Sequence, residues 1–253
     1  MSENQYFKTK SGVQFSGVSS QDLARMHGEL SELGINRFQI TEAASYSLAM
    51  VVRYALGLSA TDGKVCAIVS DCLAGLTTLA TLRHLVNAGA NGILFSLKDP
   101  ASYSEEFRAA LKPLAGMGIS LEVCGSVAAG SRANEVISTS HNVICGLYGG
   151  VEDNQKLLEV INILNEVQTP IHVVESPLGI DPDSGEKQNP LFASSTLSLG
   201  APLNGLNPAD DCVGRHYLCD ISLTKEIYSR SGDDLSKLFA EQPVTQISPV
   251  LPA

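Results

Sequence analysis

The chain has 253 residues, of which 44% are hydrophobic and 17% charged, and its formal net charge is −10. Such a composition is ordinary for a globular protein, and the length suits one large domain or two small ones. The acidic balance argues against nucleic-acid binding and against attachment to an anionic membrane. The first residues lack the apolar core of a leader, and no apolar run approaches the length of a membrane span, so we expect a cytoplasmic protein.

Six cysteines are spread along the chain, at positions 66, 72, 124, 145, 212 and 219. No two of them form a CxxC pair, so the spacing typical of zinc ribbons and thioredoxin-like sites is absent. Several stand inside apolar runs, such as Cys66 in KVCAIV. The pattern predicts small buried side chains that stay reduced.

The first elements after an N-terminal extension (1–17) are expected to be two helices. Ser20 is a suitable N-cap for a helix over 21–33, which Gly34 would end. Thr41 and Glu42 would open a second helix that ends at Gly57.

Five apolar runs then recur about 25 residues apart, as expected for one strand, one helix and two loops. They are KVCAIV (64–69), GILFSL (92–97), ISLEVC (119–124), NVICGLY (142–148) and PIHVVE (170–175). Because each run is apolar throughout, both faces of the strand should be covered by helices. The pattern predicts an α/β fold, a Rossmann-like three-layer α/β/α sandwich with a mostly parallel central sheet.

Helical spacing of leucines marks two of the intervening helices, 76–88 and 153–167, with Thr77 or Thr78 as the cap of the first. Strands are expected again over 196–200 and 216–223. We expect one domain over 18–230 and a loosely ordered tail over 231–253.

Ligands of an open α/β sheet bind beyond the carboxyl ends of the strands, so the loops at those ends hold the candidate site residues. The loop after the first strand offers Gly75 and the hydroxyls of Thr77 and Thr78. These residues suit either phosphate binding at a helix N-terminus or a plain strand-to-helix turn. Gly149 and Gly150 permit a tight turn in a later loop.

Cys145 is either a nucleophilic thiol or a buried core residue. His141 stands four residues earlier on the same strand, about 13 Å away, too far to activate the thiol.

Glu175 ends the fifth strand and is the strongest single candidate for a catalytic or ligand-holding carboxylate. The alternative is a carboxylate that accepts hydrogen bonds from loop N–H groups. Asp181 and Asp183 follow in a loop rich in Pro and Gly, where turn formation explains them as well as ligand binding does. Thr196, at the start of the next strand, completes the candidate ligand-binding set.

Six segments in this order resemble the YjeF N-terminal family, which includes NAD(P)H-hydrate epimerase. The resemblance covers roughly residues 18–228, and the segments are GINRFQITEAA (34–44), RHLVNAG (83–89), GLYGG (146–150), PIHVVESPLGIDPDSG (170–185), TLSLGAPLNGL (196–206) and GRHYLCDIS (214–222). The resemblance implies a YjeF N-terminal-like fold, an NAD(P)H-hydrate substrate, a bound potassium ion and a homodimer formed through the helices before the first strand.

The polar residues of the family's motifs are largely missing here. CLAGLTT (72–78) stands where the family has GNNGGDG, and Cys145 where the family has an aspartate implied to be catalytic and linked to the cation. Glu175 keeps a carboxylate where the family has another aspartate, whereas leucines occupy other polar positions. They are Leu73, Leu76, Leu178 and Leu203, which either close the cleft or line a pocket for an apolar compound.

Losing one general acid or base typically costs about 10²–10⁴ in rate. The leading hypothesis is therefore a pseudoenzyme that binds a partner protein or a small ligand. The alternatives are a divergent NAD(P)H-hydrate epimerase, another enzyme at the same cleft that uses Glu175, and a scaffold for RNA-linked proteins. The acidic balance disfavours the last.

Overall fold

The computed structural model describes residues 5–57, 62–124, 131–147, 154–230 and 233–250. The chain forms two compact units. Unit 1 consists of Met1–Ala44 together with Glu175–Ala253, and unit 2 is the continuous segment Ser45–Val174.

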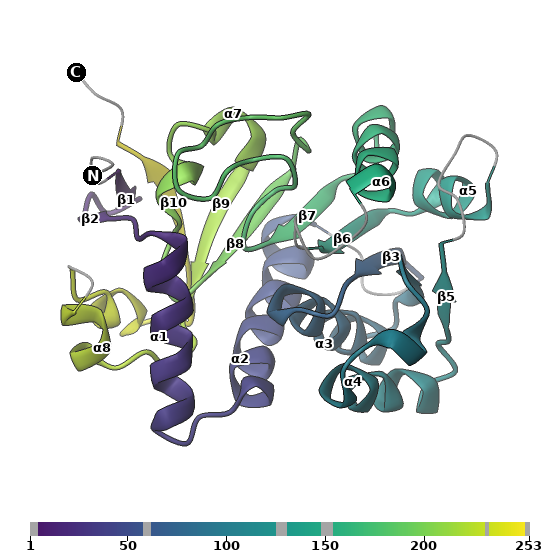
Figure 1. Ribbon diagram of the computed structural model, residues 1–253, viewed down its shortest axis with the longest axis horizontal. Coiled ribbons are helices and arrows are strands. Elements are labelled where there is room, and N and C mark those ends of the chain that lie inside the picture. Colours follow the sequence, from purple (N-terminus) through teal and green to yellow (C-terminus); the bar gives the residue numbers. More distant parts are fainter. Residues whose placement is uncertain (1–4, 58–61, 125–130, 148–153, 231–232, 251–253) are drawn as a thin grey trace. The chain divides into compact units, whose positions relative to one another are not determined.

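Unit 2 is built around five parallel strands in the order β7-β6-β3-β4-β5. Its strands are β3 (Lys64–Val69), β4 (Asn91–Ser96), β5 (Leu121–Val123), β6 (Asn142–Gly146) and β7 (Ile171–Val174). Its helices are α3 (Leu73–Asn87), α4 (Glu105–Gly116), α5 (Arg132–Thr139) and α6 (Asn154–Glu166), with the short turns η1 (Val51–Ala55) and η2 (Pro100–Ser102). Figure 1 shows α3 and α4 on one side of this sheet and α5 and α6 on the other.

Strands β3, β6 and β7 are almost completely buried because helices cover both faces of the sheet. Every residue of β6 and β7 is buried, and so is every residue of β3 after Lys64. This arrangement confirms the predicted α/β class with a parallel sheet, and β3 has the bounds that its apolar run predicts.

Unit 1 carries a mixed sheet in the order β2-β1-β10-β9-β8, in which β8 and β9 are parallel and the other neighbours antiparallel. Its strands are β1 (Tyr6–Thr9), β2 (Gln14–Ser16), β8 (Ser195–Leu199), β9 (Arg215–Cys219) and β10 (Val244–Pro249). Its helices are α1 (Ser20–Glu32), α7 (Asp210–Val213) and α8 (Lys225–Ser229), with the turns η3 (Asn204–Leu206) and η4 (Ser236–Phe239). The long helix α2 (Arg37–Met50) passes from unit 1 into unit 2.

The C-terminal segment differs from the loosely ordered tail that the sequence predicts. Residues Val244–Pro249 form β10, which pairs with β9 on one edge and with β1 on the other. The predicted N-terminal extension likewise contains β1 and β2. Of the residues in β10, only Ile247 is fully buried, so the segment shows no apolar run that would indicate a strand.

Two helix starts also differ from prediction. Ser19 caps α1, rather than Ser20, and its side chain accepts a hydrogen bond from the Asp22 N–H. Cys72 caps α3, rather than Thr77 or Thr78, so this helix begins a turn earlier than expected.

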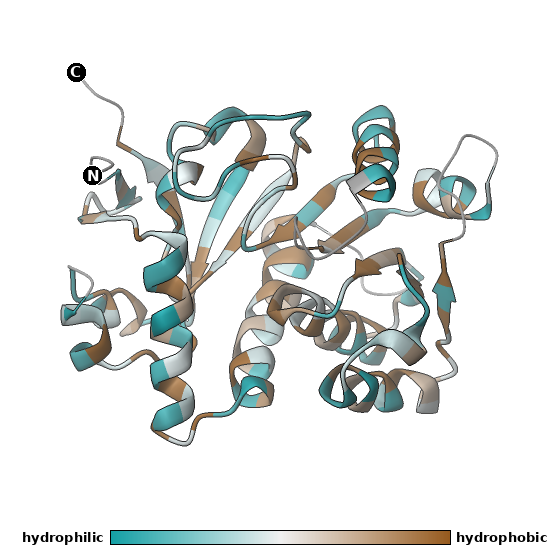
Figure 2. Ribbon diagram, in the orientation of Figure 1, coloured by the Kyte–Doolittle hydropathy of each residue, from teal (hydrophilic) through white to brown (hydrophobic). Residues whose placement is uncertain are grey.

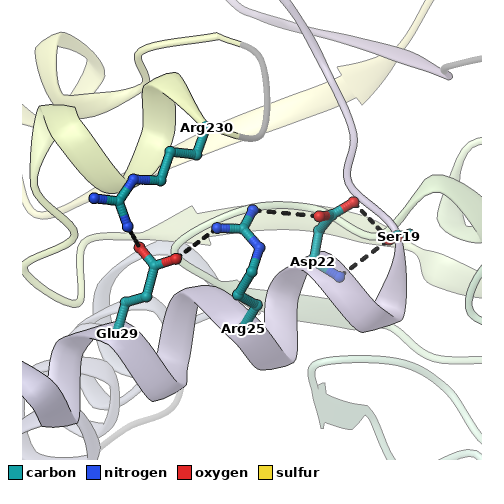
Figure 3. A network of polar contacts seen from close by, with 5 residues as sticks. All are labelled: Ser19, Asp22, Arg25, Glu29 and Arg230. Carbon is teal, nitrogen blue, oxygen red and sulfur yellow. Dashed lines mark hydrogen bonds and ion pairs between the residues drawn. The ribbon is translucent and has the colours of Figure 1, made fainter.

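Helix α1 is amphipathic, and Figure 2 shows hydrophilic and hydrophobic bands alternating along it. Its polar face carries the ion-pair network of Figure 3. Arg25 contacts Asp22 at 3.3 Å and Glu29 at 2.6 Å. Arg230, which follows α8, contacts the same glutamate at 2.9 Å and so connects α8 to α1. Among the described residues, no helix is long and apolar enough to cross a membrane.

Candidate functional site

The ends of β3 and β6 meet at the N-terminus of α3, where the sequence places the first candidate loop. The Ser70 N–H donates to the Gly146 carbonyl oxygen at 3.1 Å. A Cβ atom on Gly75 would lie 1.8 Å from the Ser70 carbonyl oxygen, and one on Gly146 would lie 2.3 Å from the Thr78 hydroxyl oxygen. Both glycines are therefore required so that α3 can pack directly on the strand ends.

The side chains in the first two turns of α3 offer little to a ligand. The Gly75 N–H donates to the Cys72 sulfur at 3.4 Å, so this amide is already used by the cap. Thr77 and Thr78 are completely buried, and neither hydroxyl oxygen has a hydrogen-bond partner among the described residues. The structure thus places these predicted ligand-binding hydroxyls inside the packed core of unit 2.

Cys145 is buried at the end of β6, and its surroundings keep the thiol neutral. Burial raises the pKa of this thiol to about 12, although a hydrogen bond from the Leu147 N–H acts in the opposite direction. A thiol reacts as a nucleophile or base only as the thiolate. His141 is occupied elsewhere, because its Nδ1 accepts the Lys64 N–H at 2.9 Å.

Glu175 combines an unusual backbone conformation with an unusual pKa. Its φ angle is +70°, in the left-handed region that few residues other than glycine adopt, and its N–H donates to the Leu197 carbonyl oxygen at 2.8 Å. Burial raises the pKa of its carboxyl group to about 7, while the positive charge of Arg37 opposes this rise. Backbone outliers and perturbed pKa values concentrate at functional sites.

The remaining candidates in unit 1 have structural partners. Asp181 accepts hydrogen bonds from the N–H groups of Asp183 and Ser184, which hold its pKa below the usual value. Asp183 accepts the N–H of Ser20 at 2.6 Å and its hydroxyl at 2.7 Å. The Thr196 hydroxyl donates to the Val213 carbonyl oxygen at 2.8 Å. Turn formation and helix anchoring account for these side chains.

The predicted site also includes a pair of glycines and four leucines. Gly149 and Gly150 lie outside the described residues. Three of the four leucines at formerly polar positions, Leu76, Leu178 and Leu203, are buried, as expected if they fill space rather than line an open pocket.

The residues present do not fit the potassium ion that the family resemblance implies. Hard cations take oxygen ligands, yet the position implied to be cation-linked carries the neutral thiol of Cys145. Within the described part of the chain, no group of three or more His, Cys, Asp or Glu residues is placed to hold a metal ion.

Sequence reasoning missed two residues close to Glu175. His27 of α1 places its Nε2 3.3 Å from the Leu199 carbonyl oxygen, and Arg37 of α2 acts electrostatically on both His27 and Glu175. No motif marks either residue. His27 is brought to β8 by this contact in the folded chain.

The parallel α/β unit and the loops at its strand ends define a Rossmann-like protein. Residues 37–205 match the family model described as YjeF-related protein N-terminus, which is well over half of the chain. The chain therefore belongs to this family, as the sequence motifs predict.

A likeness among solved structures agrees with this assignment at the level of the fold. The crystal structure of the yeast protein ynu0 (YNL200c) is 19% identical, with a TM-score of 0.77 over 92% of this chain and 100% of that chain. Among curated proteins, none matches the sequence.

Two further structures show slight likenesses that bear on neither fold nor function. The eIF2B-beta2-delta2 complex from C. thermophilum has 18% identity and a TM-score of 0.33, covering 58% of this chain and 45% of that chain. N-acetyl-L-ornithine transcarbamylase has 11% identity and a TM-score of 0.32, covering 53% of this chain and 43% of that chain.

Proposed function

We propose that this chain is a non-catalytic YjeF N-terminal domain that acts as a binding module for a small ligand or a partner protein. The observation that carries the proposal is the state of Cys145. It occupies the position of the family's implied catalytic aspartate, and burial keeps its thiol protonated. A neutral thiol in that place neither accepts the proton of a substrate nor holds a cation.

The first test is the interconversion of the two epimers of NAD(P)H hydrate, followed with purified protein. We expect the rate to equal the uncatalysed rate. A family member that keeps the aspartate at the Cys145 position serves as the positive control. Acceleration by this chain would contradict the non-catalytic assignment.

A second candidate is an enzyme that uses Glu175, because a carboxyl group with a pKa of about 7 suits proton transfer near neutral pH. In that case the Glu175→Ala variant would catalyse the reaction about 10²–10⁴ times more slowly than the wild type. An unchanged rate in the variant would remove Glu175 from the reaction.

Ligand binding is tested by thermal unfolding with NADH, NAD, ADP and AMP. A ligand at about 100 times its Kd adds about 2.7 kcal/mol of stability, which raises Tm by several degrees in a protein of this size. A shift that disappears in Glu175→Ala would place the ligand at Glu175. With no shift from any nucleotide, a protein partner becomes the occupant to seek.

We further propose a cytoplasmic homodimer that pairs through α2. The exposed aromatic side chains of α2 and η1 support this proposal, since Tyr46 is 53% exposed and Tyr54 is 68% exposed. Light scattering after gel filtration should give twice the chain mass, and Tyr46→Asp with Tyr54→Asp should give the monomer mass. Phe192→Asp, at an exposed residue outside α2, is the matched control. A wild-type monomer at high concentration would contradict the proposal.

A further inference from the structure

Strand β4 begins with an Asn-Gly dipeptide, Asn91-Gly92, and the chain contains one other, Asn204-Gly205. In such a dipeptide the backbone nitrogen of the glycine can attack the side-chain amide of the asparagine, because glycine has no Cβ atom to hinder the approach. Asn-Gly usually marks a turn, yet Asn91 is the first residue of a parallel strand. The start of β4 therefore combines a reactive dipeptide with regular structure.

Packing explains why a glycine occupies position 92. A Cβ atom there would lie 2.7 Å from Cγ2 of Val86, 3.0 Å from Cδ1 of Ile119 and 3.1 Å from Cδ1 of Leu82. Val86 and Leu82 belong to α3, so this helix packs close to the backbone at the start of β4. The fold of unit 2 thus favours Gly92 and, with it, the reactive dipeptide.

Both reacting groups of Asn91-Gly92 are accessible. Asn91 is exposed, and its side-chain amide makes no hydrogen bond with the described residues. Its backbone N–H points to β3, because it donates to the Gly63 carbonyl oxygen at 2.8 Å. Successive N–H groups of a strand point to opposite edges, so the Gly92 N–H points towards β5. Pairing between β4 and β5 begins only at Leu94 and Leu121, which leaves the Gly92 nitrogen outside that ladder.

The second Asn-Gly dipeptide is protected at both reacting groups. Asn204 is 5% exposed, and its Oδ1 accepts the Gln5 N–H at 3.4 Å. The Gly205 N–H donates to the Pro182 carbonyl oxygen at 2.8 Å. The flanking residues of the two dipeptides are alike, Ala-Asn-Gly-Ile in one and Leu-Asn-Gly-Leu in the other. The fold, rather than the local sequence, therefore distinguishes Asn91 from Asn204.

We propose that Asn91 is a site of spontaneous modification, at which the side-chain amide is lost and isoaspartate and aspartate form. Hydroxide removes the Gly92 N–H proton, the nitrogen forms a bond to Cγ of Asn91, and the bond from Cγ to Nδ2 breaks. Ammonia leaves with a proton taken from water, and a cyclic succinimide remains. Water then opens the ring. Attack at Cγ gives aspartate, and attack at the main-chain carbonyl carbon gives isoaspartate.

The two products act differently on β4. Aspartate adds a negative charge opposite Lys64 in the register of β3 and β4, which suits an exposed pair of opposite charges. Isoaspartate routes the main chain through Cβ and Cγ, so it adds a methylene to the backbone and displaces the Asn91 N–H from the Gly63 carbonyl oxygen. The modification therefore makes unit 2 more acidic and, as isoaspartate, loosens the start of β4.

The experiment incubates the folded wild-type protein in mildly alkaline buffer and, in parallel, the same protein unfolded in urea. Mass spectrometry after digestion in mild acid follows the change from amide to acid in the peptides that contain Asn91 and Asn204, and an isoaspartate-specific methyltransferase detects isoaspartate. In the folded protein Asn91 should react about tenfold faster than Asn204 or more, because ring closure needs only the strand start to open, whereas Asn204 must leave the core of unit 1. In urea the two rates should become equal.

Two variants tie the product to this side chain. Asn91→Gln lengthens the side chain and slows ring closure, so isoaspartate should disappear from this peptide. Asn87→Gln, at an exposed asparagine that is followed by alanine, is the matched control and should leave the rate at Asn91 unchanged. The proposal would be overturned if Asn91 reacted no faster than Asn204 in the folded wild type, or if Asn91→Gln kept the isoaspartate. The wild-type comparison needs no variant to fold.

Discussion

Burial raises the pKa of both Cys145 and Glu175, but only Glu175 then titrates near neutral pH. In both cases, removal from water disfavours the charged form and raises the pKa. The ordinary pKa of a thiol is near 8.5, so burial moves its titration out of the physiological range. The ordinary pKa of a glutamate carboxyl group is near 4.3, so the same effect brings its titration close to neutral pH. Burial therefore makes the Cys145 thiol unreactive and makes the Glu175 carboxyl group titratable near neutral pH.

Acid should destabilise unit 1 through His216. This imidazole is buried, its Nε2 lies 2.7 Å from the Ser198 hydroxyl oxygen, and burial lowers its pKa to about 3. The unfolded chain binds the proton near pH 6.5, whereas the folded chain does not. The free energy of unfolding therefore falls as the pH drops below about 6.5 towards 3.

The measurement is urea denaturation at neutral pH and at about pH 5. His216→Gln should lower stability at neutral pH, because it disturbs the buried pair, yet lose less stability on acidification than the wild type. Ser248→Ala, at an exposed residue of β10 that does not titrate, should keep the wild-type slope. Equal acid sensitivity in His216→Gln and wild type would rule out this origin.

The strands that the sequence predicts well are those with an unbroken apolar run. The run that predicts β3 coincides with the strand, because both of its faces are covered within one unit. In contrast, β10 has one fully buried residue and pairs with β1, more than 200 residues earlier in the chain. The local hydrophobic pattern of a sequence does not predict pairing between strands so far apart in the chain. The start of α3 was missed because cysteine is not among the usual N-cap residues.

Packing of α3 on the strand ends should tolerate no side chain at Gly75. A Cβ atom there would lie 1.8 Å from a backbone oxygen, so Gly75→Ala must displace α3 or the end of β3. We expect a loss of about 1–3 kcal/mol or more, as for other overpacked cores. Thermal unfolding provides the measurement.

Gly28→Ala is the matched control, because a Cβ atom at this position in α1 meets nothing within 4 Å. Replacement of a helix glycine by alanine should then stabilise by about 0.5–1 kcal/mol. If both variants behaved alike, the close approach at Gly75 would not be the cause.

At the scale of the whole molecule, the sequence predicts the family, the fold class and the altered residues of the site. The family match within 37–205 supports the interpretation of the motifs. His27 and Arg37 could not be predicted, because no motif marks them and His27 reaches the Leu199 carbonyl oxygen of β8 only in the folded chain, across a separation of 172 residues. This contact is a property of the folded chain rather than of any motif.

Strand β1, near the N-terminus, pairs with β10, near the C-terminus, and Phe7 lies opposite Pro249 in this antiparallel pair. Ile247, which is 3% exposed, fixes β10 to the core. Ile247→Asp should therefore cost about 4 kcal/mol or more by burying an unpaired charge. Ser248→Asp, at the exposed neighbour, should cost little. Urea denaturation compares the two, and similar losses would mean that β10 contributes little to stability.

The division of the chain also sets an order for its synthesis. Unit 2 is continuous, so all of its strands are translated before β8, β9 and β10. Helix α1 is translated before unit 2, yet the strands of unit 1 that complete its sheet are translated last. Residues of α1 that are buried in the folded chain, such as Met26 and Leu30, are therefore synthesised before the C-terminal strands of unit 1. Until the last strand is made, this apolar surface is open to chaperones.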